Sequence, residues 1–499
     1  MPEPRAWQFT AGSAALGLVL ATAAVTASGP WDGGQRTAER ARAAAPSAGV
    51  TRHAPTPAAA PPRPAAPAPA PSAPGVLRAL AAPDATALPP TGTTTGTTTG
   101  PSTGPSRTPA TRPADLAATL VPLLADPGLG SLRTASVVDT ATGTQLFGEG
   151  AGTPMTPAST VKIATVAAAL SALGPDHRIP TTVTATPDGR TVTLVGGGDP
   201  TLDPARLKSL ASDTARALKK RGHTSVRLAY DTHLYSGPTV HPIGPNENLA
   251  PVTALMTGEG RLDGSRSGPA PRTADPAGDT ATAFADLLKA AGITLTGAPA
   301  PAPNAPPKAA TPAKDAALAR THSEPLADLA ERTLTHSDND LAEALARQTA
   351  LARKQPASFD GAAKAVRDEL AGLGLPLAGA RFADGSGLDR RDRVSAALLT
   401  GLLTRAADPA RPALRPVLTG LPVGGFTGTL AGRFGTAPAG AGLVRAKTGT
   451  LTGVNTLAGT VVTADGRLLA FAFLAGRTVS PYEAQPALDR LSAALTGRS

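Results

Sequence analysis

The chain of 499 residues contains no cysteine. This absence excludes a disulfide scaffold, thiolate-bound zinc, iron–sulfur clusters and cysteine nucleophiles. The seven histidines are scattered and form no His-Glu-x-x-His pattern, so the sequence gives no support for a histidine-built metal site. We therefore expect neither a metal nor a cofactor.

Aromatic residues (3%) and charged residues (17%) are also scarce, although the net charge is +10. A positive charge is compatible with nucleic acid, a membrane surface or an anionic wall as partner. Proteins that bind single-stranded nucleic acid usually stack bases on aromatic side chains, and this chain has few of them. We therefore expect no nucleic-acid partner.

The first 27 residues have the pattern of an export signal. Arg5 precedes an uncharged run from Phe9 to Ala27, and small residues stand at cleavage-site spacing near its end. The pattern predicts a signal peptide over residues 1–27. An uncleaved anchor is the alternative, because the run is just long enough to span a bilayer. Either way, the protein is expected outside the cytoplasm, secreted or held at the outer face of the membrane or in the wall.

Residues 28–113 are rich in Pro, Ala and Thr, and their arginines outnumber their acidic residues. Such a segment cannot bury enough apolar surface to fold, so we expect a disordered basic linker. It is interpreted either as a stalk that contacts anionic cell-wall polymers or as a plain tether.

Apolar periodicity begins near Ala114 and predicts an α+β fold. A hairpin over 134–147 and a meander over 442–476 suggest an antiparallel sheet built from both chain ends and covered by helices, with no β-α-β alternation. A Pro/Ala-rich patch at 298–313 is expected to end an inserted segment. Helices are expected over 114–126, 158–173, 361–373, 394–406 and 481–495 and within 324–350, and strands also over 191–203 and 225–231.

Three short motifs carry the chemistry. Ser159 and Lys162 open a predicted helix three residues apart, on one face, where an amine can take the proton of a hydroxyl. This pair alone is weak evidence. Ser337-Asp338-Asn339 and Lys447-Thr448-Gly449-Thr450 follow in that order, and all three motifs together are rare by chance.

With these motifs the chain resembles the penicillin-recognising serine hydrolases, and among them the D-alanyl-D-alanine carboxypeptidase/endopeptidase family, the class C low-molecular-mass penicillin-binding proteins. Further matching segments are LVGGGDPTLD (194–203), APVTALMTGEG (250–260) and DGSGLDRRDRVS (384–395). The resemblance implies a serine β-lactamase/DD-peptidase-like transpeptidase fold. A catalytic domain would comprise 114–180 and 320–499, and a large inserted domain 181–319 would lie between the first and second motifs.

The resemblance also implies residue roles. Ser159 would be the nucleophile, Lys162 its general base, Ser337 a proton relay, and Asn339 a support for Lys162 and the substrate amide. The substrate-binding residues would be Lys447, Thr448, Gly449 and Thr450. The lysine and threonines of this strand would bind the terminal carboxylate of the substrate. The backbone N–H groups of Ser159 and Thr450 would form an oxyanion hole.

Gly449 would let the backbone of a ligand lie alongside its strand. The approach of Lys447 to Lys162 should lower the pKa of the Lys162 amine.

Asp384 and Ser386 are interpreted as a tight turn that braces the site. Asp389 and Ala475-Gly476 depart from the family pattern, which has serine and asparagine at those places.

The implied substrates are peptidoglycan stem peptides, with β-lactams as covalent inhibitors. Whether the enzyme trims peptide ends or cuts cross-links stays open. A β-lactamase or esterase of the same superfamily is one alternative, although no Glu-x-x-x-Asn segment marks a class A enzyme. A non-catalytic wall-binding protein is the other, although Ser159, Lys162, Ser337 and Lys447 are all present.

Overall fold

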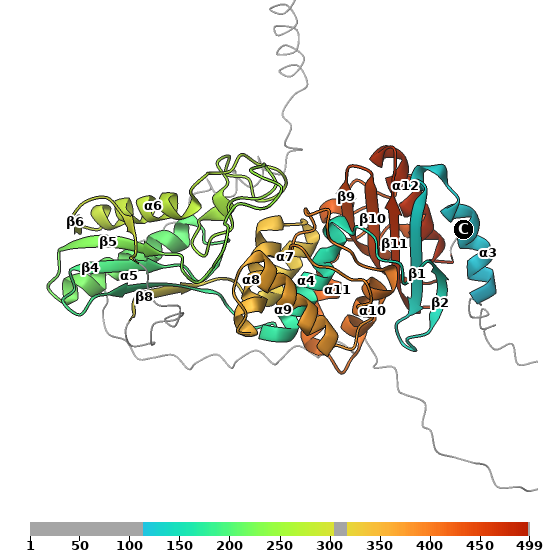
Figure 1. Cartoon of the computed structure of the whole chain (residues 1–499), viewed down its shortest axis with the longest axis horizontal. Helices are drawn as coiled ribbons and strands as arrows, with labels where there is room; N and C mark the ends of the chain where they lie inside the picture. Colours follow the sequence, from blue (N-terminus) through green and yellow to red (C-terminus); the bar gives the residue numbers. More distant parts are fainter. Residues whose placement is uncertain (1–112, 304–316, 498–499) are drawn as a thin grey trace, which may run out of the picture. The chain divides into compact units, whose positions relative to one another are not determined.

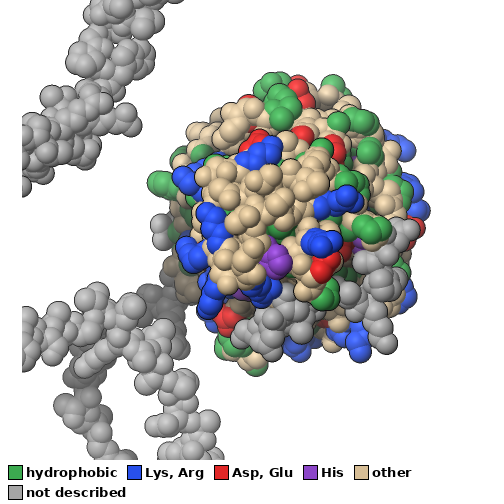
Figure 2. Space-filling view, turned by 90° about the vertical axis from the view of Figure 1, so that its left-hand side faces the viewer, with side chains coloured by type: hydrophobic (Ala, Val, Ile, Leu, Met, Phe, Trp, Pro, Cys, Tyr) green, Lys and Arg blue, Asp and Glu red, His purple; other side chains and the backbone are tan. Residues whose placement is uncertain are grey.

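The computed structural model describes residues 113–303 and 317–497. The predicted export signal (1–27) and nearly all of the predicted linker lie outside the described residues, as does most of the Pro/Ala-rich patch. No helix in the described part of the chain is both long and apolar enough to cross a bilayer. On the face shown in Figure 2, Lys and Arg side chains are scattered and do not form a single patch.

A five-stranded antiparallel sheet joins the two ends of the described chain (Figure 1). Its order is β2-β1-β11-β10-β9, and β1 pairs with β11 from Leu132–Gly476 to Asp139–Leu469. The predicted sheet built from both chain ends is therefore confirmed. Its strands are β1 Leu132–Asp139, β2 Gln145–Glu149, β9 Val444–Leu451, β10 Val454–Val462 and β11 Leu468–Gly476.

Helices cover both faces of this sheet, so β11 is apolar along its whole length. Its Ala470, Ala472 and Leu474 pack into one core with a helical layer. Phe471 and Phe473 pack into the other core. The first core is built with α4 Lys162–Leu173, α7 Leu326–Thr335, α8 Asn339–Ala352, α9 Phe359–Gly372, α10 Ala396–Ala407 and α11 Pro416–Thr419, and the second with α3 Pro113–Leu124 and α12 Pro481–Ala494.

A second sheet of order β6-β5-β4-β3-β8, with β7 also paired to β5, occupies residues 180–322. Here β4 and β5 run parallel across α5, and β5 and β6 run parallel across α6. The expectation that β-α-β alternation is absent is therefore wrong for this part of the chain. The elements are β3 Pro180–Ala185, β4 Thr191–Val195, α5 Pro204–Lys220, β5 Ser225–Asp231, α6 Pro276–Ala290, β6 Thr294–Leu295, β7 Ala300–Pro301 and β8 Ala317–His322.

The helical stretch predicted within 324–350 is broken between α7 and α8. Ser337 lies in the left-handed region at φ 58°, which a continuous helix cannot accommodate. Asp338 then caps α8, because its Oδ1 accepts the backbone N–H of Leu341 at 3.0 Å. Short 3₁₀ turns complete the chain: η1 Pro127–Leu129, η2 Ala158–Val161, η3 Gly258–Gly260, η5 Pro412–Leu414, η6 Gly428–Leu430 and η7 Pro438–Gly440.

Candidate active site

Ser159 and Lys162 lie where η2 passes into α4. Ala158, directly before the serine, has a left-handed φ of 48°, which sets the serine at a sharp bend. One 3₁₀ turn further on, Lys162 begins α4, and its Nζ donates to Ser159 Oγ at 3.0 Å. The helical spacing read from the sequence thus brings the hydroxyl and the amine into direct contact.

The Lys162 amine has two further acceptors. Its Nζ donates to Asn339 Oδ1 at 2.7 Å and to the backbone carbonyl of Ser386 at 2.5 Å. An ammonium group has three donors, and these acceptors match all three. Asn339 therefore joins the first motif as the sequence implied, whereas the Ser386 carbonyl is a partner that motif reading did not supply.

The corner between α7 and α8 forms one side of an open cleft. The side chain of Asn339 is fixed from its other end, because Nδ2 donates to the Asn248 carbonyl at 2.9 Å. Ser337 is half-buried and lines the cleft. The cleft brings together Ser159, Asn248, Arg261, His336, Ser337, Asn339, Leu388 and Thr450.

The third motif lies on β9, the edge strand of the five-stranded sheet. Lys447 is fully buried, and its Nζ donates to the Thr448 carbonyl at 2.8 Å. The Thr448 hydroxyl lies 2.9 Å from that of Thr429, and Thr450 is exposed in the cleft. All four predicted substrate-binding residues therefore lie on one strand, and Thr450 is the one of them that lines the cleft with Ser159.

The structure explains why glycine is needed at position 449 in a different way from the sequence analysis. A Cβ at this position would collide with the Thr456 hydroxyl and stand 2.7 Å from the Pro157 carbonyl. The missing side chain thus lets β9 pack against the segment that carries Ser159. Contact between protein segments, independent of any ligand, already requires glycine here.

The pKa of Lys162 is lowered to about 8. Burial is the largest cause, and the negative charges of Asp384 and Glu343 oppose it. The direction expected from the sequence is confirmed, but the expected cause, the charge of the second lysine, is not the main one. The influence between the two lysines is recorded at Lys447, whose pKa is lowered well below its usual value by burial and by the charge of Lys162.

Two groups of buried side chains have the spacing that a metal ion could use. In the first, ligand atoms of His241, Glu343 and Asp384 lie within 4.8 Å of one another. His241 Nε2 hydrogen bonds with Asp384 Oδ2, and the two carboxylates accept backbone N–H groups. The second consists of Glu259, Asp338 and Asp340, and it is paired with Arg261, Arg272 and Arg332. Protein partners thus account for both clusters.

Sequence reasoning missed the residues that the loop between β5 and α6 adds to the site. His241, Asn248 and Arg261 come from this loop, and each contacts or lines the region around Ser159. The segment APVTALMTGEG (250–260) was noted as family-like, but no local pattern shows where the loop packs. In contrast, the sequence predicts that the turn of Asp384 and Ser386 braces the site, and the structure has this turn against Ser159 and Lys162.

The chain is similar to known carboxypeptidases over most of its length. It is 36% identical over 401 residues to the carboxypeptidase DacB of Mycolicibacterium smegmatis, covering 76% of this chain and 83% of that protein. It is 31% identical over 432 residues to the D-alanyl-D-alanine carboxypeptidase of an Actinomadura species, covering 69% of this chain and 78% of that protein.

Among solved structures, penicillin binding protein 4 of Haemophilus influenzae shares the fold, with a TM-score of 0.62 and 24% identity over 77% of this chain and 98% of that one. The model of the D-Ala-D-Ala carboxypeptidase 3 (S13) family matches residues 116–265 and 252–495. These matches cover both sheets and all three motifs. The chain therefore belongs to the D-Ala-D-Ala carboxypeptidase 3 (S13) family.

Proposed function

We propose that the protein is an exported serine D-alanyl-D-alanine carboxypeptidase that hydrolyses peptidoglycan stem peptides through an acyl-enzyme on Ser159. The observation that carries this proposal is the 3.0 Å contact between Ser159 Oγ and Lys162 Nζ at the cleft. The proposal includes the export signal at 1–27, the linker at 28–113 and the catalytic and inserted domains inferred from the sequence.

Lys162 acts as the general base in its neutral form. A neutral amine has two N–H donors and one lone pair. The Asn339 amide oxygen and the Ser386 carbonyl accept the two N–H groups, so the lone pair is directed at the Ser159 hydroxyl. A pKa of about 8 keeps part of the amine neutral near neutral pH, which a base for this reaction needs.

Acylation proceeds when Ser159 Oγ attacks the carbonyl between the two terminal D-alanines and its proton passes to Lys162. The oxyanion is bound by the backbone N–H groups of Ser159 and Thr450. Collapse breaks the C–N bond, and the leaving amine takes a proton through Ser337, which faces the same cleft. Water then hydrolyses the ester, which restores Ser159 and releases the shortened peptide.

Lys447 and the two threonines of β9 hold the terminal carboxylate of the substrate. A D-alanyl cross-link presents the same acyl group to Ser159, so we include endopeptidase action on cross-links in the proposal. A β-lactam presents a strained acyl group, and the crystal structure of the H. influenzae protein with a β-lactam supports including these compounds as covalent inhibitors.

The test is the intact mass of the purified protein after exposure to benzylpenicillin, followed over hours. We expect a lasting adduct of one penicillin that Ser159→Ala abolishes and Ser171→Ala keeps. Ser171 lies exposed on the same helix and serves as the matched control. An adduct that vanishes within seconds while penicillin is consumed would indicate a β-lactamase. A folded protein with no adduct would contradict the proposal.

A further inference from the structure

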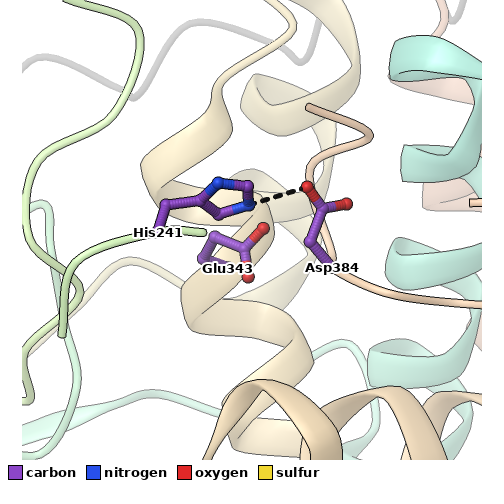
Figure 3. Close-up of side chains that lie close together, drawn as sticks. All are labelled: His241, Glu343 and Asp384. Atoms are coloured by element: carbon purple, nitrogen blue, oxygen red, sulfur yellow. Dashed lines mark hydrogen bonds and ion pairs between the residues drawn. The ribbon is translucent and has the colours of Figure 1, made fainter. Parts of the chain in front are cut away.

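The loop between β5 and α6 places a buried histidine beneath the active site. The side chain of His241 is 2% exposed, and its Nε2 lies 2.9 Å from Asp384 Oδ2, with Glu343 beside the pair (Figure 3). Its Nδ1 accepts the N–H of Ile243 at 3.3 Å, so the neutral ring carries its proton on Nε2 and donates it to Asp384. The rings of His241 and Phe359 also pack in a T-shaped arrangement, with their centroids 5.3 Å apart.

Asp384 organises the turn of residues 384–389. Its Oδ1 accepts the N–H of Gly387 at 2.6 Å. Its Oδ2 accepts the N–H of Asp389 at 2.8 Å and the Ser386 hydroxyl at 3.0 Å, in addition to His241. The path of the turn therefore depends on how this one carboxylate is oriented, and two side chains from outside the turn contact it, those of His241 and Asp392.

The turn delivers the Ser386 carbonyl to Lys162. Glu343 Oε1 accepts the N–H groups of Gly385 and Ser386 at 3.0 and 2.9 Å, which holds this peptide from α8. The hydroxyl of Thr165, on the helix of Lys162, donates to the Gly385 carbonyl at 2.7 Å. A displacement of the turn would therefore move one of the acceptors that orient the Lys162 amine.

We propose that His241 is a positioning residue for the general base. It holds Asp384, and through the turn of residues 384–389 it fixes the carbonyl that directs the lone pair of Lys162 at Ser159. A loop of the second sheet thereby controls the reactivity of a lysine at the start of α4. The inference rests on the proposed role of Lys162 as the base.

Charge adds a second link between His241 and Lys162. Burial lowers the pKa of His241, but the hydrogen bond to Asp384 and the negative charges of Glu343, Asp384 and Asp389 raise it above its usual value. A protonated ring offsets the charge of Asp384, which otherwise raises the pKa of Lys162. The charged and titratable groups around the ring come from residues 384–392, α8 and α4: Asp384, Asp389, Asp392, Glu343, Arg347 and Lys162.

These charges determine in which direction the pKa of Lys162 changes when His241 is replaced. Where His241 is protonated, its removal leaves the Asp384 charge uncompensated, and the pKa of Lys162 rises. Acylation needs neutral Lys162, and the acid limb of its pH profile then moves to higher pH, by about one unit. Loss of the hydrogen bond as well also displaces the turn, which lowers the maximum acylation rate on the order of tenfold.

The experiment compares His241→Gln, His241→Ala and His233→Ala. Glutamine keeps a donor for Asp384 but never a charge. His233 makes the same kind of contact, Nδ1 to Asp231 Oδ1 at 2.8 Å, at the start of the same loop but away from the turn, and is the matched control. Two quantities are measured across pH: the acylation rate with benzylpenicillin, and the pKa of Lys162 from the NMR shifts of lysine labelled at the side-chain carbon and nitrogen.

We expect both His241 variants to raise the pKa of Lys162, the alanine variant alone to lose maximum rate, and the His233 variant to match the parent. A folded His241→Ala variant that keeps both the Lys162 pKa and the maximum acylation rate would overturn the inference. So would equal losses of maximum rate in both. The NMR measurement does not need catalysis: a shifted Lys162 pKa in a protein that penicillin never acylates would refute the proposed function and leave the coupling standing.

Discussion

The Lys162 pocket and the Lys447 strand each bury a lysine completely, but they differ in the charges that lie near the amine. The Lys162 pocket consists of Lys162, Ser159, Asn339 and the Ser386 carbonyl, so the amine faces three oxygen acceptors. The negative charges of Asp384 and Glu343 also act on this amine and raise its pKa. The Lys447 strand is the run 447–450 of β9, in which the amine donates to the neighbouring Thr448 carbonyl. The nearby charge that affects Lys447 is the positive one of Lys162.

The difference shows that burial alone does not set the pKa of a buried amine. Burial lowers the pKa of both amines. The carboxylates near Lys162 oppose this effect, so that the pKa of Lys162 is about 8 and both the neutral and the charged form are present near neutral pH. For Lys447 burial and charge act in the same direction. A carboxylate entering the cleft would reverse that effect, which suits an anion-binding role and not a proton-transfer role.

The largest effect should come from neutralising each lysine in turn with a side chain of similar length. Lys162→Met removes the proposed base, and we expect acylation by every substrate to fall by about 10²–10⁴-fold. Lys447→Met should lower kcat/KM about 30-fold or more for D-alanyl-D-alanine peptides with a free carboxylate, because it removes a buried charge partner.

Peptides with an amidated end separate the two lysines. Lys447→Met should have little further effect on their kcat/KM, whereas Lys162→Met should be as damaging as with a free carboxylate. Stopped-flow acylation and steady-state peptide hydrolysis measure both quantities. If Lys447→Met harmed both kinds of peptide equally, the division of roles between the two regions would be wrong.

A smaller effect should come from Gly387, in the turn that supports the Lys162 pocket. It has a φ of 82°, and an added Cβ would collide with the Ala158 carbonyl. Gly387→Ala should lower the free energy of unfolding by about 3 kcal/mol, since steric overlap adds to backbone strain. It should also slow acylation.

Gly143→Ala is the matched control for this substitution. Gly143 has a similar φ of 70°, but nothing lies within 4 Å of an added Cβ. Only the backbone strain applies, so we expect a loss of about 1 kcal/mol and no change in acylation. Urea unfolding of both variants makes the comparison, and equal losses would mean that the turn is not wedged against the serine segment.

The smallest effect should come from Thr429→Val beside the Lys447 strand. The Thr429 hydroxyl lies 2.9 Å from that of Thr448, but Thr429 is exposed and water can replace it. We expect KM for carboxylated peptides to rise by at most about threefold, with kcat unchanged. A fall in kcat without a change in KM would place Thr429 in proton transfer and blur the contrast between the two regions.

Part of the architecture could be read from local patterns. The strand at 225–231 appears with the predicted bounds, and the terminal hairpin and meander form one sheet. The β-α-β units of residues 180–322 were missed, although α5 buries Leu207, Leu210, Ala211 and Leu218 at helical spacing. The neighbouring strands are short, β6 having two residues, so strand periodicity was too weak to reveal a parallel sheet.

The sequence by itself determined that Ser159 and Lys162 meet, because residues one turn apart need no long-range contact, and the three motifs together indicated the family. The tertiary structure alone decided what surrounds this pair. His241 and Asp384 are 143 residues apart, and the carbonyl that accepts from Lys162 belongs to the backbone, which leaves no mark in the choice of side chain. Helical spacing brings together residues three or four apart, whereas burial, charge balance and backbone acceptors depend on how distant segments pack.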